Sequence, residues 1–262
     1  MNLELKGRAA LVNGASSGIG EAVARALAAE GVNLILCARN GEKLAAKAAA
    51  IAAEFGVQAV PHAADVAAED AAAGAVGEAL ARFGRLDILL NNGGGPPAGR
   101  FDTLNESQWK DAADLLLMSA VRFTRAVLPA MKAAHWGRIL NVSSVSVKAP
   151  IDNLMLSNSL RAAVIGFAKT LSTEVAPYGI TVNNLLPGRI HTPRLDYLAE
   201  QNAKNGGTAQ QVFEGWVSEI PMGRLGEPQE VGALAAFLAS PLAGYLTGQS
   251  IAVDGGLLRN LY

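Results

Sequence analysis

Short apolar segments alternate with long alanine-rich segments along the chain, and this alternation limits the fold more than any other feature. The apolar segments, predicted to be strands, lie at 8–13, 33–37, 58–60, 86–90, 138–142, 180–186 and 250–253. The alanine-rich segments, predicted to be helices, lie at 19–30, 42–55, 68–83, 109–134, 157–176 and 228–239. Strands that are apolar throughout are typical of parallel sheets covered by helices on both faces. The sequence therefore predicts an α/β fold with a doubly wound parallel sheet as the middle of three layers.

The length and composition favour a single domain that spans residues 1–262. Half of the residues are apolar and 17% are charged, which suits one large buried core. The formal net charge of -1 provides no field that would attract a nucleic acid or an anionic membrane. Cys37 is the only cysteine, and the first residues do not resemble a signal peptide, so a cytoplasmic protein is expected. We therefore expect a small molecule as the partner, with no nucleic acid and no membrane.

The first predicted strand leads directly into a glycine-rich turn and then into a predicted helix. The turn reads Gly14-Ala15-Ser16-Ser17-Gly18-Ile19-Gly20. Glycine lets the backbone turn tightly and approach a pyrophosphate closely, and amide groups at the start of a helix can bind the phosphates. We therefore expect a dinucleotide at this turn, bound by Gly14, Ser16, Ser17, Gly18, Ile19 and Gly20. A glycine-rich turn without any ligand is the structural alternative.

Further motifs follow this turn in order, as far as the C-terminal part of the chain. They are Asp65-Val66, Asn91-Asn92-Gly93-Gly94, Pro187-Gly188 with Thr192, and Val253-Asp254-Gly255-Gly256. Together with the glycine turn, they resemble the landmarks of the short-chain dehydrogenase/reductase family over essentially the full length. The resemblance implies a Rossmann-type fold. It also implies that the cofactor contacts Asp65, Val66, Asn92, Gly93, Pro187, Gly188 and Thr192.

The residues after the second predicted strand favour NADP(H) over NAD(H). In dinucleotide-binding folds, an acidic side chain at this point binds the ribose hydroxyls of NAD. Here the sequence is Cys37-Ala38-Arg39-Asn40, so no acid at this position repels a 2′-phosphate. Arg39 can pair with that phosphate through a charge-assisted hydrogen bond. If Arg39 only ends a strand at the surface, the preference would be slight.

The catalytic residues of the family are mostly replaced in this chain. In the family a tyrosine donates a proton to the substrate carbonyl, and a lysine on the next helical turn lowers the pKa of the phenol. Counting back from Gly166 places Ser157 at the tyrosine position and Arg161 at the lysine position. The family's asparagine maps to Leu116 or its neighbour, so that only the substrate-orienting serine, Ser144, is present.

The predicted catalytic residues are therefore Ser144, Ser157 and Arg161, with no metal ion. A serine hydroxyl is a poor general acid because its pKa lies well above that of a phenol. Arg161 stays charged, so we expect it to bind the cofactor ribose or to stabilise an oxyanion. Two alternatives remain open. Ser157 belongs to a cluster that caps the start of a helix, or Arg161 forms a salt bridge at the surface.

These replacements leave two hypotheses for the function. The first is an NADP(H)-dependent oxidoreductase that transfers hydride to or from a carbonyl, an imine or a similar group through an atypical active site. Donors to a developing oxyanion can supply part of the catalysis without a phenol. The second is a catalytically impaired, nucleotide-binding pseudoenzyme or regulatory subunit. For the enzyme, Tyr197, His191 and Lys148 are weaker candidates for the proton donor.

The stretch from about 188 to 207 has no regular pattern and is interpreted as a flexible lid, with the whole lid expected at about 188–217. The pocket walls are expected to include Pro96, Pro97, Ser146, Val147 and Leu154. These residues favour a mostly apolar substrate. The resemblance also implies a homotetramer, assembled through the predicted helices at 109–134 and 157–176.

Overall fold

The computed structural model describes residues 2–203 and 206–261, and its centre is one seven-stranded sheet. The strands are β1 Ala9–Asn13, β2 Asn33–Ala38, β3 Ala59–Ala63, β4 Ile88–Asn91, β5 Gly137–Val142, β6 Ile180–Pro187 and β7 Ser250–Val253. Their order is β3-β2-β1-β4-β5-β6-β7, and every pair is parallel. The prediction of a doubly wound parallel sheet is confirmed.

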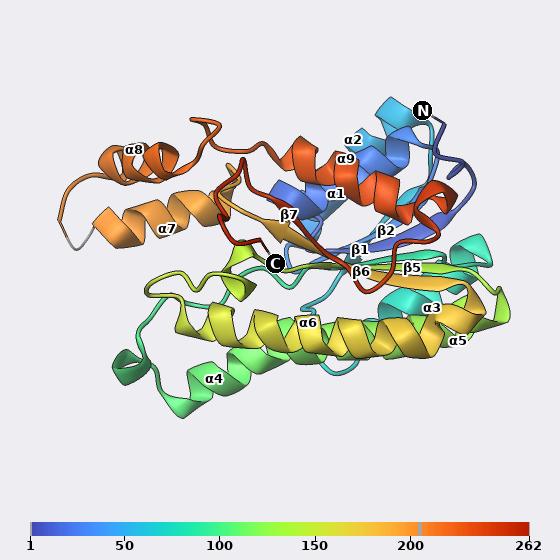
Figure 1. Ribbon diagram of the computed structural model, residues 1–262. Helices are drawn as coiled ribbons and strands as arrows, with labels where there is room; N and C mark the ends of the chain where they lie inside the picture. The colour runs from blue at the N-terminus through green and yellow to red at the C-terminus, as the bar shows by residue number, and fades with distance from the viewer. Residues whose placement is uncertain (1, 204–205, 262) are drawn as a thin grey trace.

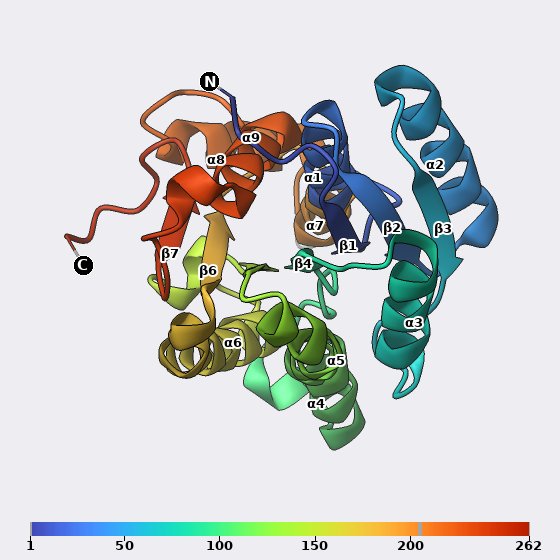
Figure 2. The ribbon, with the colours of Figure 1, turned by 90° about the vertical axis from the view of Figure 1, so that its right-hand side faces the viewer.

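Helices cover both faces of the sheet (Figures 1 and 2). One face carries α1 Gly18–Ala29, α2 Gly41–Phe55 and α9 Pro228–Ala239, and the other carries α3 Ala71–Phe83, α5 Ser119–Ala133 and α6 Met155–Val175. Three further helices, α4 Glu106–Ala113, α7 Pro193–Ala203 and α8 Ala209–Glu219, extend past one end of the sheet (Figure 1). Among the described residues, no helix combines the length and the apolar character needed to cross a membrane.

Short helical turns complete the described structure. They are the 3-10 turns Phe101–Thr103, Val145–Val147, Ala176–Tyr178 and Pro241–Ala243, and the π-helical turn Asp114–Met118. The π-helical turn lies between α4 and α5, so the predicted continuous helix at 109–134 is in fact two helices joined by one wider turn. The apolar pattern of the sequence does not distinguish such a turn from an α-helix, because a single inserted residue changes the phase only once.

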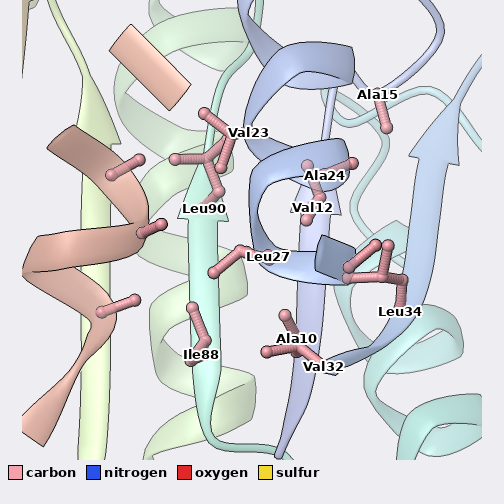
Figure 3. Packing of buried hydrophobic residues seen from close by; sticks show 14 of the residues in the cluster. Ala10, Val12, Ala15, Val23, Ala24, Leu27, Val32, Leu34, Ile88 and Leu90 are labelled. Carbon is pink, nitrogen blue, oxygen red and sulfur yellow. The ribbon is translucent and has the colours of Figure 1, made fainter. Parts of the chain in front are cut away.

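The core between the sheet and α1 consists of buried aliphatic side chains (Figure 3). Val23, Ala24 and Leu27 of α1 are fully buried and belong to the same apolar cluster as the strand residues Val12 and Leu90. Each large side chain buried in this way contributes roughly 1.5–3 kcal/mol. This packing fixes the first turn of α1 against the end of β1, where the glycine-rich turn lies.

The chain order of the strands reverses next to β1, which pairs with β2 on one side and with β4 on the other. In open parallel sheets, the loops after such neighbouring strands separate and leave a crevice at their carboxyl ends. The segments that follow β1 and β4 are the glycine-rich turn and the Asn92-Gly93-Gly94 segment. The fold therefore brings the predicted site motifs to one edge of the sheet.

A ladder of buried amide side chains crosses four strands just below this edge. The Nδ2 atom of Asn91 donates to Asn141 Oδ1 at 2.9 Å, and Asn141 Nδ2 donates to Asn184 Oδ1 at 3.0 Å. Asn184 Nδ2 in turn donates to Ser250 Oγ at 3.1 Å. The four residues are direct neighbours in the strand register. Because these bonds are buried or partly buried, they hold β4 to β7 in register below the site.

Two other predictions on secondary structure need correction. The strand predicted at 58–60 lies at Ala59–Ala63 and includes Pro61, which an edge strand tolerates because one side of its backbone has no sheet partner. The stretch at 188–207, predicted to be irregular, contains α7, whose buried Leu195 and Ala199 pack against α8. Lys204 and Asn205 of the expected lid lie outside the described residues.

We expect Asn141→Asp to destabilise the protein by about 2–4 kcal/mol. A carboxylate at this buried position still accepts from Asn91 but cannot donate to Asn184, and two acceptors then face each other. Urea unfolding would measure the change in the free energy of unfolding. Asn105→Asp is the matched control, because Asn105 caps α4 at the surface and its side chain is used there as an acceptor. Equal stability of both variants would show that the ladder contributes nothing.

Candidate functional site

A cavity of about 430 Å³ lies at the carboxyl edge of the sheet, next to the reversal in strand order. Almost all of the predicted site residues line it: Gly14, Ser16, Ser17, Gly18, Ile19, Arg39, Asp65, Val66, Asn92, Gly93, Ser144, Ser157, Arg161, Pro187, Gly188 and Thr192. Gly20 does not line the cavity. The fold thus brings the predicted cofactor-binding and catalytic residues into one cavity.

Gly20 supports the turn from behind. A Cβ atom at this position would lie 2.2 Å from the carbonyl oxygen of Gly14 and 2.9 Å from Asn92 Nδ2. Gly14 has a φ of 65°, a conformation that glycine adopts without strain. The two glycines therefore let α1 pack directly on the turn. The sequence alone predicted Gly20 to contact the ligand and did not reveal this packing role.

The start of α1 is open toward the cavity. Ser17 is the N-cap residue of α1, yet within the described structure its side chain accepts no capping hydrogen bond from the helix. The amide groups of the first helical turn therefore remain available, and the positive end of the helix dipole points the same way. A phosphate fits such a site, because it is an anion with several acceptor oxygens.

Arg39 and Asp65 lie at the other end of the cavity, after β2 and β3. Arg39 is exposed and follows the buried Ala38, so no acid stands at the end of β2. Asn40 beside it is the N-cap of α2 and accepts from the Lys43 amide at 2.9 Å. Arg39 thus lies just before a helix, and within the described part of the chain its guanidinium forms no salt bridge, so it can bind an anionic group.

Arg161 is the most highly bonded side chain of the cavity wall. Its Nη1 atom donates to the carbonyl oxygens of Val142 at 2.9 Å and Ser143 at 3.1 Å, and Nη2 donates to the carbonyl oxygen of Gly94 at 2.5 Å. Nε donates to Ser157 Oγ at 3.0 Å. The guanidinium therefore links α6 to the loops that follow both β4 and β5.

The salt-bridge alternative for Arg161 is wrong. In the described structure Ser157 itself caps no backbone amide, although Asn158 beside it accepts from the Ile151 amide. Arg161 forms no salt bridge at the surface, since among the described residues its partners are carbonyl oxygens and a hydroxyl. Ser157 is buried in the first turn of α6, and its oxygen accepts from Arg161. The N-cap of α6 is Leu154. The spacing of four residues places both side chains on one face of the helix.

Charge in this wall is positive. Desolvation lowers the pKa of Arg161 to about 10, and the positive charge of Arg194 acts in the same direction. At neutral pH the guanidinium still carries its proton, so Arg161 acts as a fixed cation and hydrogen-bond donor. An anion or a developing negative charge in the cavity is stabilised by this arrangement.

Ser144 and Ser157 each accept one hydrogen bond from the protein. Ser144 Oγ accepts from the Ser146 amide at 3.1 Å, and Ser157 Oγ accepts from Arg161 Nε at 3.0 Å. A hydroxyl that accepts one bond retains its own proton for donation. Because both residues line the cavity, the two hydroxyls can donate to an oxygen atom of a bound molecule.

The weaker candidates for the proton donor do not reach this cavity. Lys148 is exposed, and His191 is exposed with its ring 3.6 Å from Asp196. Tyr197 lines a second cavity of about 1100 Å³ next to the first. Leu116, at the predicted asparagine position, is buried in the π-helical turn. Among the described residues, no group of three His, Cys, Asp or Glu side chains could hold a metal ion.

Arg189 and Arg194 were missed by the sequence-based prediction, although both line the cavity. Arg194 extends from α7 and donates to the carbonyl oxygen of Pro96 at 2.6 Å, across the cavity. A Cβ atom at Gly95 would lie 2.5 Å from Arg194 Nε, so the loop after β4 allows this contact because it has a glycine there. The one feature of the sequence that could have indicated their place in the cavity is that both lie within three residues of Thr192.

Comparisons with known proteins agree with this fold. A family model described as enoyl-(acyl carrier protein) reductase matches residues 14–258. Short-chain reductase protein NovJ of Streptomyces niveus is 37% identical over 247 residues, which cover 94% of this chain and 92% of NovJ. The chain belongs to the short-chain dehydrogenase/reductase family.

Two further members of the short-chain dehydrogenase/reductase family are similar over nearly the whole chain. NADPH-dependent reductase BacG of Bacillus subtilis (strain 168) is 35% identical over 259 residues, covering 97% of this chain and 99% of BacG. The crystal structure of L-sorbose reductase from Gluconobacter frateurii, complexed with NADPH and L-sorbose, matches with a TM-score of 0.95 at 34% identity. That comparison covers 100% of both chains.

The C-terminal motif of this short-chain dehydrogenase/reductase supports the floor of the cavity. Asp254 accepts from the amides of Gly256 at 3.0 Å and Leu258 at 2.9 Å, which closes a tight turn after β7. A Cβ atom at Gly188 would lie 2.8 Å from Asp254 Cβ. The Pro187-Gly188 segment therefore needs its glycine for packing against this turn.

We expect Gly20→Ala to destabilise the protein by about 1–3 kcal/mol, because the new Cβ overlaps the backbone of Gly14. Thermal unfolding would show a lower Tm. Gly77→Ala is the matched control, since Gly77 is an exposed residue of α3 and a Cβ atom added there would meet no atom within 4 Å. There the loss of backbone freedom in the unfolded chain predicts a small gain in stability. A Gly20→Ala protein as stable as the wild type would contradict the close packing.

Proposed function

We propose that this protein is an NADPH-dependent reductase that delivers hydride to a carbonyl, imine or similar group through an atypical active site. The observation that carries the proposal is the shared cavity, in which the open start of α1 and Arg39 lie together with Ser144, Ser157 and Arg161. A site with only a structural role has no need for two free hydroxyl donors beside a fixed cation.

The choice of NADP(H) rests on the end of β2 and on two relatives. Arg39 stands there without an acidic neighbour at position 38 and can bind a 2′-phosphate. BacG is named an NADPH-dependent reductase, and the L-sorbose reductase was crystallised with NADPH. In this chain the glycine turn and the first amides of α1 would hold the pyrophosphate, and Asp65 and Val66 would border the adenine.

Hydride is the chemistry that NADPH supplies when it is bound. The chain's own residues orient the substrate and stabilise the developing charge. Ser144 and Ser157 donate hydrogen bonds from their hydroxyls to the substrate oxygen and orient it in the cavity. Arg161 increases the donor strength of Ser157, because its charged Nε–H binds the serine oxygen. Negative charge that develops on the substrate oxygen is thus stabilised by two hydroxyl donors backed by one cation.

No residue in this arrangement replaces the missing phenol as a strong acid. Serine hydroxyls and the Arg161 guanidinium hold their protons at neutral pH. The final proton on a carbonyl oxygen would therefore come from water that enters the cavity. A substrate that already carries positive charge, such as an iminium ion, needs no proton when it accepts hydride. Cationic imines are for this reason included with carbonyl compounds in the proposed substrate range.

We also propose a lid over the cavity and a homotetrameric assembly. The described parts of the expected lid, residues 188–203 and 206–217, would cover the cavity, and Arg194 of α7 contacts the loop after β4 across it. For the assembly we propose a homotetramer. Met118 beside α5 and Tyr245 before β7 are exposed large apolar residues in the described structure, and such residues are suited to contacts between copies. Light scattering on a sizing column would give the oligomeric state.

We expect calorimetric titration to show NADPH binding at least about tenfold tighter than NADH binding. Arg39→Asp should weaken NADPH binding by about tenfold to hundredfold, since it replaces a charge-assisted bond by repulsion. NADH binding should weaken far less, because NADH has no 2′-phosphate. Arg259→Asp is the control for the change in net charge, because Arg259 is exposed and lies outside the cavity. Equal affinities of NADPH and NADH for the wild type would contradict the assignment.

Ser157→Ala should lower kcat for NADPH oxidation with an activated ketone by about a hundredfold, the usual effect of removing one oxyanion donor. KM should change little. In the wild type, kcat should be flat between about pH 6 and 9, because neither serine titrates there and the pKa of Arg161 is lowered only to about 10. A marked fall of kcat within that range would show that an unassigned acid or base takes part.

The loss of the phenol also supports a second candidate, a nucleotide-binding pseudoenzyme or regulatory subunit. Its signature would be tight NADPH binding with no turnover of ketones, cyclic imines or activated alkenes. Turnover that depends on Ser144 and Ser157 would exclude it.

A further inference from the structure

Arg189 lies where the two cavities meet. It follows Gly188 at the end of β6 and lines both the first cavity and the larger second cavity. Ile151, Leu154 and Leu198 also line both. A molecule that extends from the reacting centre into the second cavity therefore has to pass Arg189.

The guanidinium of Arg189 lacks the partners that a buried cation normally has. Its Nε atom is inaccessible to solvent and, within the described residues, has no hydrogen-bond partner. No carboxylate of the described chain lies within 4.0 Å of it. Desolvation lowers the pKa of Arg189, and the more distant Glu219 opposes that shift only in part. A partly desolvated cation without a paired carboxylate is costly, so this position favours an anionic ligand that reaches the accessible edge of the guanidinium.

An aromatic side chain holds the guanidinium in place. Its central carbon lies 4.4 Å from the centre of the Trp216 ring. Phe213 packs its ring edge-on to Trp216, with ring centres 5.6 Å apart and an angle of 87°. Stacking of this kind satisfies the face of a guanidinium and leaves the N–H groups at its edge free. Arg189 is therefore oriented before any ligand binds.

The second cavity has both apolar and polar lining residues around this cation. Its volume is about 1100 Å³, and its apolar lining includes Val145, Pro150, Leu257 and Leu258. The other arginine that lines it, Arg100, is exposed. Asp152 and Glu219 also line this cavity, so an anionic group is favoured only beside Arg189, and the apolar body of a ligand fits against the apolar residues.

We propose that Arg189 is a specificity-determining residue that binds the carboxylate of an apolar oxo acid or imino acid substrate at the junction of the two cavities. This inference rests on the proposed reductase function and names its substrate class. The carboxylate accepts from the terminal N–H groups of Arg189, a residue that lines both cavities, while the apolar body displaces water from the second cavity.

The test measures binding and not only turnover. Benzoylpropionate, benzoylbutyrate and the methyl ester of each are titrated calorimetrically into protein saturated with NADP⁺. Esterification removes the negative charge but keeps the ketone and the aromatic body. At least one acid should bind about tenfold to hundredfold more tightly than its ester, as expected for a charged hydrogen bond. Equal binding of acids and esters to the wild-type protein would overturn the proposal.

Substitutions assign the effect to one residue. Arg189→Gln should reduce the preference for the acid to about one, and Arg189→Lys should restore part of it because the positive charge returns. Arg100→Gln is the matched control, since it removes an exposed arginine from the same cavity. It should leave the preference unchanged. Loss of the preference in Arg100→Gln, with no loss in Arg189→Gln, would transfer the carboxylate site to Arg100 and overturn the proposal.

Two further measurements separate failure of this inference from failure of the proposed function. NADPH affinity and Tm of Arg100→Gln should match the wild type, because Arg100 is exposed and does not line the first cavity. If no substrate is turned over but the acid preference depends on Arg189, the binding inference holds and the reductase proposal fails. If ketones are reduced with no preference for acids, the reductase proposal holds and this inference fails.

Discussion

The site depends on one guanidinium that donates hydrogen bonds to four acceptors in three different segments. Arg161 joins Ser157 on its own helix to carbonyl oxygens after β5 and to that of Gly94 after β4. Without these bonds, the loops at the carboxyl ends of the two strands would be connected mainly through the sheet below them. The asparagine ladder aligns the strands, and Arg161 then fixes the ends of the loops that line the cavity. The Arg161 side chain thus both positions the loops that line the cavity and supplies positive charge to it.

Positive charge outweighs negative charge around this guanidinium. Arg194 comes from α7 and lowers the pKa of Arg161 through its charge, and Arg189 lies at the opening to the second cavity. Asp65 lies at the far end, near Arg39. A cavity of this kind is more stable with anions inside it, and a dinucleotide phosphate together with an acidic substrate would provide them. The same field favours a transition state in which negative charge develops on oxygen.

The segment at 188–207 shows where sequence patterns fail for a physical reason. Between 188 and 207 the apolar residues are few, because α7 buries only a narrow stripe that includes Leu195 and Ala199. That stripe packs against Trp216 of α8 and not against the main core. A helix with so small a buried face has a weak periodic signal, so the segment resembled an irregular loop. The central strands, by contrast, are buried on both faces and were predicted almost residue for residue.

Residue type and spacing were sufficient to predict the parallel sheet, the glycine turn, the absence of an acid after β2 and the placement of Ser157 and Arg161 on one helical face. All of these are local patterns, because residue type and spacing dictate strand, turn and helix face. The folded chain was needed to show that Arg161 bonds to backbone carbonyls and that Gly20 packs behind the turn. It was also needed to show that Arg189 Nε, at the junction of two cavities, has no acceptor among the described residues. These contacts join residues distant in the chain, and the partners of a long side chain depend on which segments folding brings within its reach.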